Sequence, residues 1–374
     1  MGEVKNTTIK KSSSIILVFI ITIITFFVVV KIHSFATDGN ITMPENSSPN
    51  IDNYINSINT EIPCYKESTL PRLHVDGNTI YDEKNREIIF CGFCCGTSTR
   101  ITMDWPRWYT DETFKTIRSW GVNIFRFTLK PDQYVSHPEY LQLLCNYIDL
   151  CVDNNLYVLV SWMGNKDYLD YSSQAASFFS YLSDRYKNCN NIIYEVCNEP
   201  FHSSWSTINN YATTITDIIR SNNPYALVAV PTPYHTIEGD DYIDSVLLSP
   251  IERENIIYTF HMYVGGSLKD STLNSLSLLN DNNIPLLISE WGTTLSNGRD
   301  GFFEEKSLIW LDYLKNRRIG WINFNLSDVY WKDTPYNSSV AKMGEWNSCL
   351  DDNILSPSGF LIKHYILGDY ITNE

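Results

Sequence analysis

Basic side chains are scarce in this sequence. Its 374 residues include 28 Lys and Arg against 43 Asp and Glu, which gives a formal net charge of −15 and a pI of about 4.9. Proteins that bind nucleic acid neutralise phosphates with a basic patch or stripe, and this sequence has no such stripe. The charge therefore argues against a nucleic-acid partner, and it fits a secreted enzyme with a neutral substrate.

Paired cysteine motifs with the spacing of a zinc site are also missing. The chain has 9 cysteines, an odd number, but it has neither two CxxC motifs nor a Cys/His cluster with zinc spacing. Cys91, Cys94, Cys95 and Cys197 fall on or just after expected core strands, where a thiol packs like a small apolar side chain. We therefore expect no metal, while the pairing of the cysteines stays open.

Aromatic side chains, in contrast, are plentiful. They make up 14% of the residues, with 10 Trp and 24 Tyr. A core uses some of these large rings, but many carbohydrate sites also stack the faces of sugars on them. The composition is therefore compatible with a protein that binds sugars.

The N-terminal segment has the pattern of a targeting sequence. Lysines near the start precede an uninterrupted apolar run over residues 15–30, which Lys31 closes. The run is short for a membrane span and long for the core of a signal peptide, and Ser34-Phe35-Ala36 matches the small-residue spacing of a cleavage site. We expect residues 1–36 to be a signal peptide or an uncleaved signal anchor. Either one predicts that the rest of the chain is secreted, or membrane-anchored outside the cytosol.

The remaining sequence divides into a linker and one large domain. Residues 37–68 are rich in Asn, Ser, Thr and Pro, as linkers often are. Residues 69–374 are numerous enough for a single large α/β domain. We take a monomer as the default state.

Two apolar stretches end in a glutamate. The first, residues 192–200 (IIYEVCNEP), has the pattern of a buried strand that gives way to a loop at Asn198 and Glu199. The second, residues 285–292 (PLLISEWG), ends in the same way at Glu290. Glycoside hydrolysis uses two carboxylates, one as acid and base and one to attack the sugar or activate water. The pair therefore suggests a glycosidase.

Strands and helices alternate along the domain. A hairpin with Asp76-Gly77-Asn78 as its turn comes first. Eight expected strands follow. The first ends near residue 93, and the other seven span 122–127, 157–162, 192–197, 226–230, 256–261, 285–290 and 320–324. The expected helices span 111–120, 138–154, 173–186, 206–222, a poorly marked segment near 242, 273–282, 303–316 and 360–367. This alternation predicts an α/β fold, a (β/α)8 TIM barrel with a short N-terminal hairpin.

The barrel also predicts where the chemistry lies. Functional side chains of this fold gather at the C-terminal ends of the strands. The candidates at these ends are Arg126 on the second strand, Asn198 and Glu199 after the fourth, His261 and Tyr263 on the sixth, and Glu290 on the seventh.

These residues carry a resemblance to the glycoside hydrolase family 5 cellulases of clan A, and most to their bacterial-type endoglucanases. It extends from Leu73 to the C-terminus. The motifs that carry it are WGVNIFR at residues 120–126, YEVCNEP at 194–200, HMY at 261–263, SEWGT at 289–293 and WINFNLSD at 321–328.

The resemblance implies retaining endo-hydrolysis of β-1,4-glucan without a cofactor, with a polysaccharide as the partner. It makes Glu199 the general acid/base and Glu290 the nucleophile. It further implies that Arg126 and Tyr263 hold Glu290 ionised, that Asn198 bonds the sugar 2-hydroxyl, and that His261 lines the pocket. Three rings match platform positions for sugars: Trp205, Tyr234 and Phe324.

The sequence departs from the family pattern at several positions. Met163 and the Cys94-Cys95-Gly96 stretch stand where the family usually has histidines, and Phe324 replaces a tryptophan. A related β-glycanase acting on mannan or glucomannan, or a transglycosylase, is therefore an alternative function. A carbohydrate-binding homologue with weak or no catalysis is the alternative from another class.

Overall fold

The computed structural model describes residues 65–232, 240–329 and 338–371, with the backbone alone for residues 240–242. The segment predicted as signal peptide or anchor and nearly all of the predicted linker lie outside these residues. Within them, no helix is long and apolar enough to cross a membrane.

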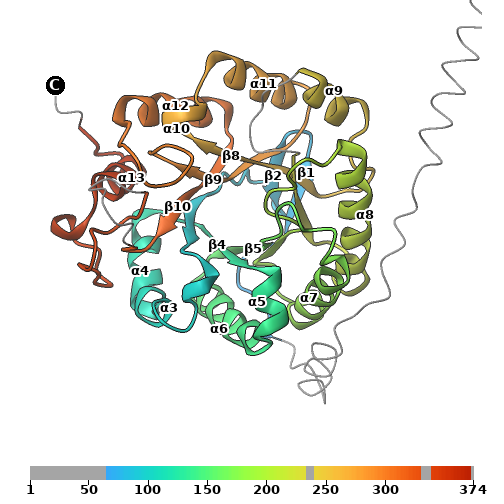
Figure 1. The fold of residues 1–374 in the computed structure, drawn as a ribbon, viewed down its shortest axis with the longest axis horizontal. Helices are drawn as coiled ribbons and strands as arrows, with labels where there is room; N and C mark the ends of the chain where they lie inside the picture. Colours follow the sequence, from blue (N-terminus) through green and yellow to red (C-terminus); the bar gives the residue numbers. More distant parts are fainter. Residues whose placement is uncertain (1–64, 233–239, 330–337, 372–374) are drawn as a thin grey trace, which may run out of the picture. The chain divides into compact units, whose positions relative to one another are not determined.

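Eight parallel strands close into a barrel, as predicted (Figure 1). The last strand pairs with the first, with Trp321 opposite Cys91, so the sheet has no open edge. In chain order the strands are β3 (Cys91–Cys95), β4 (Ile124–Leu129), β5 (Tyr157–Trp162), β6 (Ile192–Glu195), β7 (Leu227–Pro231), β8 (Ile256–Tyr263), β9 (Leu286–Gly292) and β10 (Gly320–Leu326).

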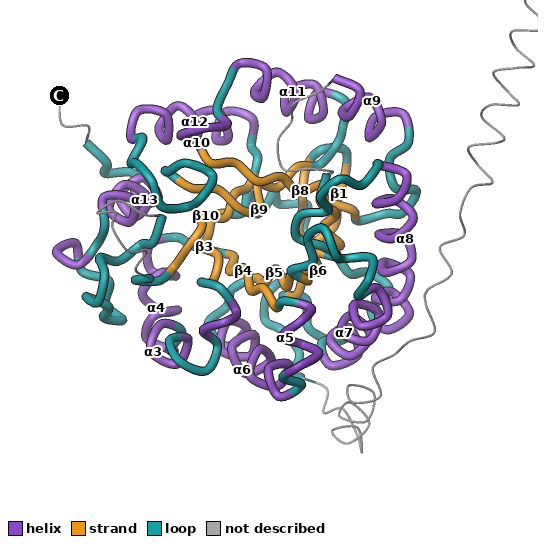
Figure 2. Tube along the Cα trace, viewed as in Figure 1, coloured by secondary structure: helices purple, strands orange, loops and turns teal. Residues whose placement is uncertain are grey.

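Helices surround this barrel on its outside (Figure 2). The longer ones are α4 (Asp111–Trp120), α6 (Glu139–Asp153), α7 (Ser172–Arg185), α8 (Trp205–Asn222), α9 (Asp240–Leu248), α11 (Asp270–Asp281), α12 (Glu304–Arg317) and α13 (Pro357–Leu367). Short segments that the sequence did not predict lie before and between them: η1 (Ser98–Arg100), α3 (Trp105–Trp108), α5 (Pro131–Ser136), α10 (Val264–Ser267) and η2 (Asp352–Ile354).

The ends of α4 illustrate how the sequence sets a boundary. Thr110 precedes the helix, and its side chain accepts a hydrogen bond from the backbone N–H of Thr113. Gly121 ends the helix with a φ of 113°, a left-handed conformation that a side chain would disfavour. The chain then turns directly toward β4, so this helix starts and stops where its capping residues lie.

A small hairpin precedes the barrel, as predicted. Strands β1 (Leu73–Asp76) and β2 (Thr79–Asp82) pair antiparallel, with Val75 opposite Ile80. Gly77 has a φ of 58° in the connecting turn, which glycine adopts without strain.

The core lies in the barrel and between the barrel and its helices. Every residue of β4, β5 and β8 is buried, which explains why these strands appear as continuous rather than alternating apolar runs. A few of the buried strand residues are charged or ionisable. On the barrel strands the buried acidic, basic and imidazole side chains are Arg126, Glu195, His261 and Glu290, and the buried Asp82 lies on β2 of the hairpin.

Candidate active site

The structure brings six of the predicted site residues together at the C-terminal ends of the strands. Because all eight strands are parallel, their C-terminal ends meet at one face of the barrel. The six come from β4, from the loop after β6, from β8 and from β9: Arg126, Asn198, Glu199, His261, Tyr263 and Glu290.

Both carboxylate oxygens of Glu290 receive a hydrogen bond. The Tyr263 hydroxyl donates to Oε1 at 2.7 Å, and Nη1 of Arg126 donates to Oε2 at 3.0 Å. Glu290 is only 7% exposed, so these donors replace water around the carboxylate. Burial and the adjacent Glu290 raise the pKa of Tyr263 well above its ordinary value, which keeps its hydroxyl a donor.

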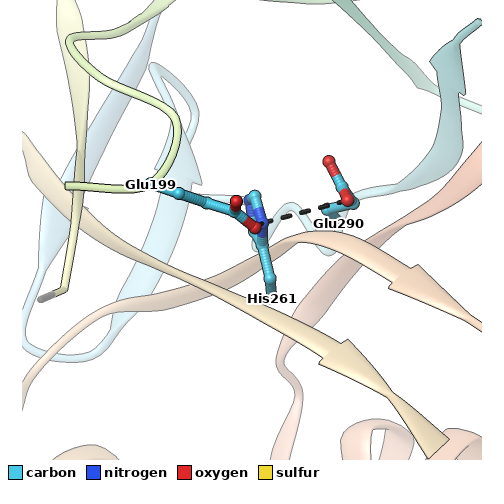
Figure 3. A group of neighbouring side chains, drawn as sticks. All are labelled: Glu199, His261 and Glu290. Atoms are coloured by element: carbon cyan, nitrogen blue, oxygen red, sulfur yellow. Dashed lines mark hydrogen bonds and ion pairs between the residues drawn. The ribbon is translucent and has the colours of Figure 1, made fainter. Parts of the chain in front are cut away.

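His261 lies between Glu290 and Glu199 (Figure 3). Its Nδ1 is 2.7 Å from Oε1 of Glu199 and 3.9 Å from Oε1 of Glu290. Burial disfavours the charged imidazole, but the negative charges of Glu290 and Glu199 outweigh it and hold the pKa of His261 above its ordinary value.

One ligand-type atom from each of Glu199, His261 and Glu290 lies within 4.8 Å of the other two. Among the described residues this is the group close enough to hold a metal ion. The two carboxylates that the sequence predicted as a catalytic pair therefore lie close together, with His261 within hydrogen-bonding distance of Glu199. The absence of a metal remains a prediction from the sequence.

Asn198 connects the Arg126 side of the site to a neighbouring loop. Its Oδ1 accepts from Nη2 of Arg126 at 2.6 Å, and its Nδ2 donates to Asn165 at 2.9 Å. One N–H of the amide is thereby used and the second is left over. The backbone N–H groups of Asn198 and Glu199 both lie 3.2 Å from the carbonyl oxygen of Gly164, which fixes the loop after β6.

Comparison with known proteins identifies the family of the chain. The family model described as Cellulase (glycosyl hydrolase family 5) matches residues 81–329. The chain belongs to glycosyl hydrolase family 5.

The family-5 chain is similar to curated endoglucanases. It is 30% identical over 288 residues to Endoglucanase A of Butyrivibrio fibrisolvens, a match that covers 74% of this chain and 65% of that protein. It is 29% identical over 283 residues to an endoglucanase of Clostridium saccharobutylicum, covering 72% of this chain and 60% of that one. The chain thus spans 60% to 65% of the length of these two relatives.

Solved structures share the fold. The catalytic domain of Thermobifida fusca endoglucanase Cel5A in complex with cellotetraose aligns with a TM-score of 0.70 at 23% identity, covering 79% of this chain and 97% of that domain. The alkaline cellulase K catalytic domain aligns with a TM-score of 0.69 at 22% identity, covering 82% of this chain and 96% of that domain. At these identities the likeness concerns the barrel itself.

The family-5 site includes one buried carboxylate to which we assigned no role from the sequence. Glu195 ends β6, is fully buried, and its Oε2 accepts from Nε of Arg126 at 2.8 Å. Burial opposes its ionisation, but Arg126 and then His261 hold the pKa of Glu195 below its ordinary value. The sequence did contain a signal for such a role, because a charged residue in an otherwise apolar strand needs a buried partner.

The three predicted sugar platforms have different outcomes. Trp205 is only 6% exposed, donates its indole N–H to the carbonyl oxygen of Ser249 at 2.7 Å and packs 5.9 Å from the ring of Tyr258. It is a core residue, which corrects the expectation that it stacks on sugar. Tyr234 lies outside the described residues. Phe324 on β10 is half-buried, with its ring 6.4 Å from that of Tyr263.

Met163, which stands where the family usually has a histidine, borders an open space. Met163 lines a cavity of about 380 Å³ together with Phe201, two residues after Glu199, and with Asn165, the partner of Asn198. The cavity adjoins the site through these two residues. In the Cys94-Cys95-Gly96 stretch, which also departs from the family pattern, the thiol of Cys94 lies 3.5 Å from Nη1 of Arg126.

Irregularities in the strands occur beside the site residues. The register of β8 against β9 shifts between Phe260 and His261, after which His261 lies opposite Glu290. The register of β10 against β3 shifts after Phe324. Such bulges redirect side chains at the ends of strands, and sequence patterns do not reveal them.

Proposed function

We propose that this chain is a retaining endo-β-1,4-glucanase that hydrolyses internal bonds of cellulose or a soluble β-glucan. The observation that supports this proposal most directly is that an oxygen of Glu199 and an oxygen of Glu290 lie within 4.8 Å of each other. The two carboxyl groups are about 5–5.5 Å apart in retaining glycosidases and about 6.5–9.5 Å apart in inverting ones. The endoglucanase relatives at 30% and 29% identity support the substrate class.

In the first step, a carboxylate oxygen of Glu290 attacks the anomeric carbon of the sugar. The bond from that carbon to the leaving oxygen breaks, and the Glu199 carboxyl transfers its proton to this oxygen. Arg126 and Tyr263 each donate to one oxygen of Glu290, which holds the nucleophile in one orientation. Such preorganised donors avoid a cost of reorganisation during the reaction.

In the second step, water replaces the departed sugar. The Glu199 carboxylate accepts a proton from the water, whose oxygen attacks the anomeric carbon and releases Glu290. Covalent attachment has meanwhile removed the negative charge of Glu290, which favours the ionised form of Glu199 that this step needs. The free N–H of Asn198 Nδ2 is the group that we assign to the sugar 2-hydroxyl, and Phe324 remains the candidate platform.

Release of reducing ends tests this function. The full chain is assayed on carboxymethylcellulose, barley β-glucan and glucomannan, with Glu290→Ala beside it and Glu305→Ala, on the outer helix α12, as the matched control. We expect activity on the glucans that Glu290→Ala abolishes and Glu305→Ala retains. Release of mannose oligomers without glucose oligomers would identify a related β-glycanase instead. Binding of a polysaccharide without turnover would identify a carbohydrate-binding protein.

The role of Glu199 has its own test. Glu199→Ala is expected to lose most activity on substrates with poor leaving groups, because the variant has no acid to protonate them. On an aryl glycoside with a good leaving group, whose release needs no acid, added azide should restore part of the activity by attacking the covalent intermediate in place of water. No rescue, with circular dichroism like that of the wild type, would count against Glu199 as acid and base.

For the location of the chain, we propose that the catalytic domain lies outside the cytosol. The support is the lysine-flanked apolar run over residues 15–30. Cell fractionation with N-terminal sequencing distinguishes the two versions: a new N-terminus after Ala36 in the medium indicates a cleaved signal peptide, and an intact chain in the membrane fraction indicates an anchor. An intact chain in the cytosol would contradict both.

A further inference from the structure

Glu195 is a third carboxylate near the catalytic pair that the proposed reaction leaves without a role. It is the last residue of β6, four residues before Glu199, and it is fully buried. Its Oε2 lies 2.8 Å from Nε and 2.7 Å from Nη2 of Arg126, which is buried equally deeply. A buried ion pair often adds little to stability, because removing both charges from water costs about as much as their attraction returns.

Several side chains make the surroundings of Glu195 suitable for a permanent negative charge. Arg126 is the main stabilising partner, and His261 adds to its effect. Together they hold the pKa of Glu195 below its ordinary value despite burial. The titratable or charged groups around the Glu195–Arg126 pair are Arg126 on β4, Cys94 on β3, His261 on β8, Glu290 on β9 and Cys197 after β6.

The contacts of Glu195 determine which way Arg126 faces. A guanidinium group is planar and presents its N–H groups in a fixed fork. Glu195 engages the Nε edge of this fork. Nη1 is then aimed at Glu290, at 3.0 Å, and Nη2 at Asn198, at 2.6 Å. A rotation of the guanidinium would lose both contacts at once.

The charge of Glu195 matters most when the sugar reacts. As Glu290 forms its covalent bond it loses its negative charge, while positive charge develops on the sugar ring. Arg126 stays positive throughout and lies within hydrogen-bonding distance of Glu290. An ionised Glu195 balances the guanidinium, so that the developing positive charge on the sugar does not face an uncompensated cation.

We propose that Glu195 is a positioning residue of this reaction, which orients Arg126 toward Glu290 and Asn198 and compensates its charge in the transition state. The proposal rests on the glycosidase function proposed above. The competing view is a structural ion pair that only supports the fold of the barrel.

The test compares Glu195→Gln, which keeps the shape and removes the charge, with the wild type. Asp149→Asn is the matched control, because Asp149 pairs at 2.7 Å with the largely buried Arg185 on the outer helices α6 and α7. For Glu195→Gln we expect kcat to fall roughly 10- to 100-fold with little change in KM, the scale expected for a misplaced catalytic group. The control should lower the melting temperature and leave kcat unchanged.

Two readouts separate positioning from a structural role. Positive charge develops on the sugar ring with any leaving group. The loss of kcat in Glu195→Gln should therefore persist on an aryl β-cellobioside, whose good leaving group needs no acid. Both limbs of the pH profile of kcat/KM should also move to lower pH, because removing a negative charge favours the ionised form of neighbouring acids. A lower melting temperature with unchanged kcat and pH profile would overturn the proposal.

A second variant, Glu195→Asp, and an NMR titration of His261 provide two further tests of the proposal. If Glu195→Gln does not fold, Glu195→Asp keeps the charge but shifts it by one methylene. Its kcat should then fall at least about tenfold, and an unchanged kcat would overturn the proposal. The His261 imidazole, assigned with His261→Asn, should titrate at lower pH in Glu195→Gln. An inactive wild type would contradict the glucanase function and with it the role of Glu195 in that reaction. An active wild type whose kcat is unchanged by Glu195→Gln or Glu195→Asp would contradict the role of Glu195 alone.

Discussion

At the scale of single residues, Tyr263 provides the sharpest prediction. Its hydroxyl donates to Oε1 of Glu290 at 2.7 Å in a buried site. Tyr263→Phe removes this donor with little change of shape, and the loss of one preorganised donor to a reacting oxygen typically costs roughly 10²-fold in kcat. We expect a loss of that size, measured on a soluble β-glucan.

The control for this variant is Tyr365→Phe. Tyr365 donates to Asp312 on the outside of the barrel, at 3.3 Å. Its loss should leave kcat unchanged. Equal activity of Tyr263→Phe and the wild type would mean that Arg126 alone positions Glu290.

His261 predicts a dependence of stability on pH. The two glutamates hold the pKa of His261 above its ordinary value in the folded state. Its protonation therefore stabilises the fold fully below the unfolded value of about 6.5. This contribution is lost as the pH rises through the higher folded value. The melting temperature of the wild type should exceed that of His261→Asn most at pH 5, and the difference should narrow toward pH 9.

Thermal unfolding of both proteins across this pH range measures the effect. A difference that stays constant, or that grows as the pH rises, would show that His261 is not held in its protonated form by Glu199 and Glu290.

The sequence predicted where single residues lie when a motif ended a strand, but it did not predict positions that depend on packing; the roles of the residues stay predictions. Glu199 and Glu290 were visible because each follows an apolar run. Trp205 was misjudged because its position in a loop motif does not reveal that its ring packs against Tyr258. Glu195 received no role because only the folded chain shows that Arg126 lies beside it.

At the scale of elements, Gly92 on β3 shows how closely the strands approach. A Cβ atom added there would lie 1.8 Å from the carbonyl oxygen of Ile124 on β4, which is backbone and cannot move aside without separating the strands. Gly92→Ala should therefore lower the free energy of unfolding by about 3 kcal/mol, the upper end of the usual cost of overpacking.

Urea unfolding measures this change, and Gly266→Ala is the control. An added Cβ at Gly266, in the short helix α10, would lie an ordinary 3.8 Å from the side chain of Leu295. This variant should retain nearly the full stability. If the two variants lose the same amount, strand contact at Gly92 is not the cause.

Elements were predictable in proportion to their length and burial. Helix 111–120 and strand 157–162 have the predicted limits, because capping residues or an unbroken apolar run define them. The three short helices α3, α5 and α10 were missed. Segments of four to six residues carry too little periodicity to be recognised, and tertiary contacts hold them in place.

At the scale of the whole molecule, the order of strands and helices was sufficient to predict the barrel. Eight strands separated by helices have one favourable closed arrangement, and closure carries their C-terminal ends to one face. The register shifts that bring His261 opposite Glu290 were not predictable, because they depend on how neighbouring strands fit together. The approach of the two glutamates to within 4.8 Å is therefore a property of the closed barrel.

That approach makes the configuration of the product the most direct test of our account. Proton NMR can follow the anomeric protons while the chain hydrolyses cellopentaose, before mutarotation mixes the two anomers. We expect the β-anomer to form first, because two successive displacements by Glu290 and by water restore the original configuration. The α-anomer forming first would contradict a nucleophilic Glu290 and show that water attacks the anomeric carbon in a single displacement, with one carboxylate as base and the other as acid.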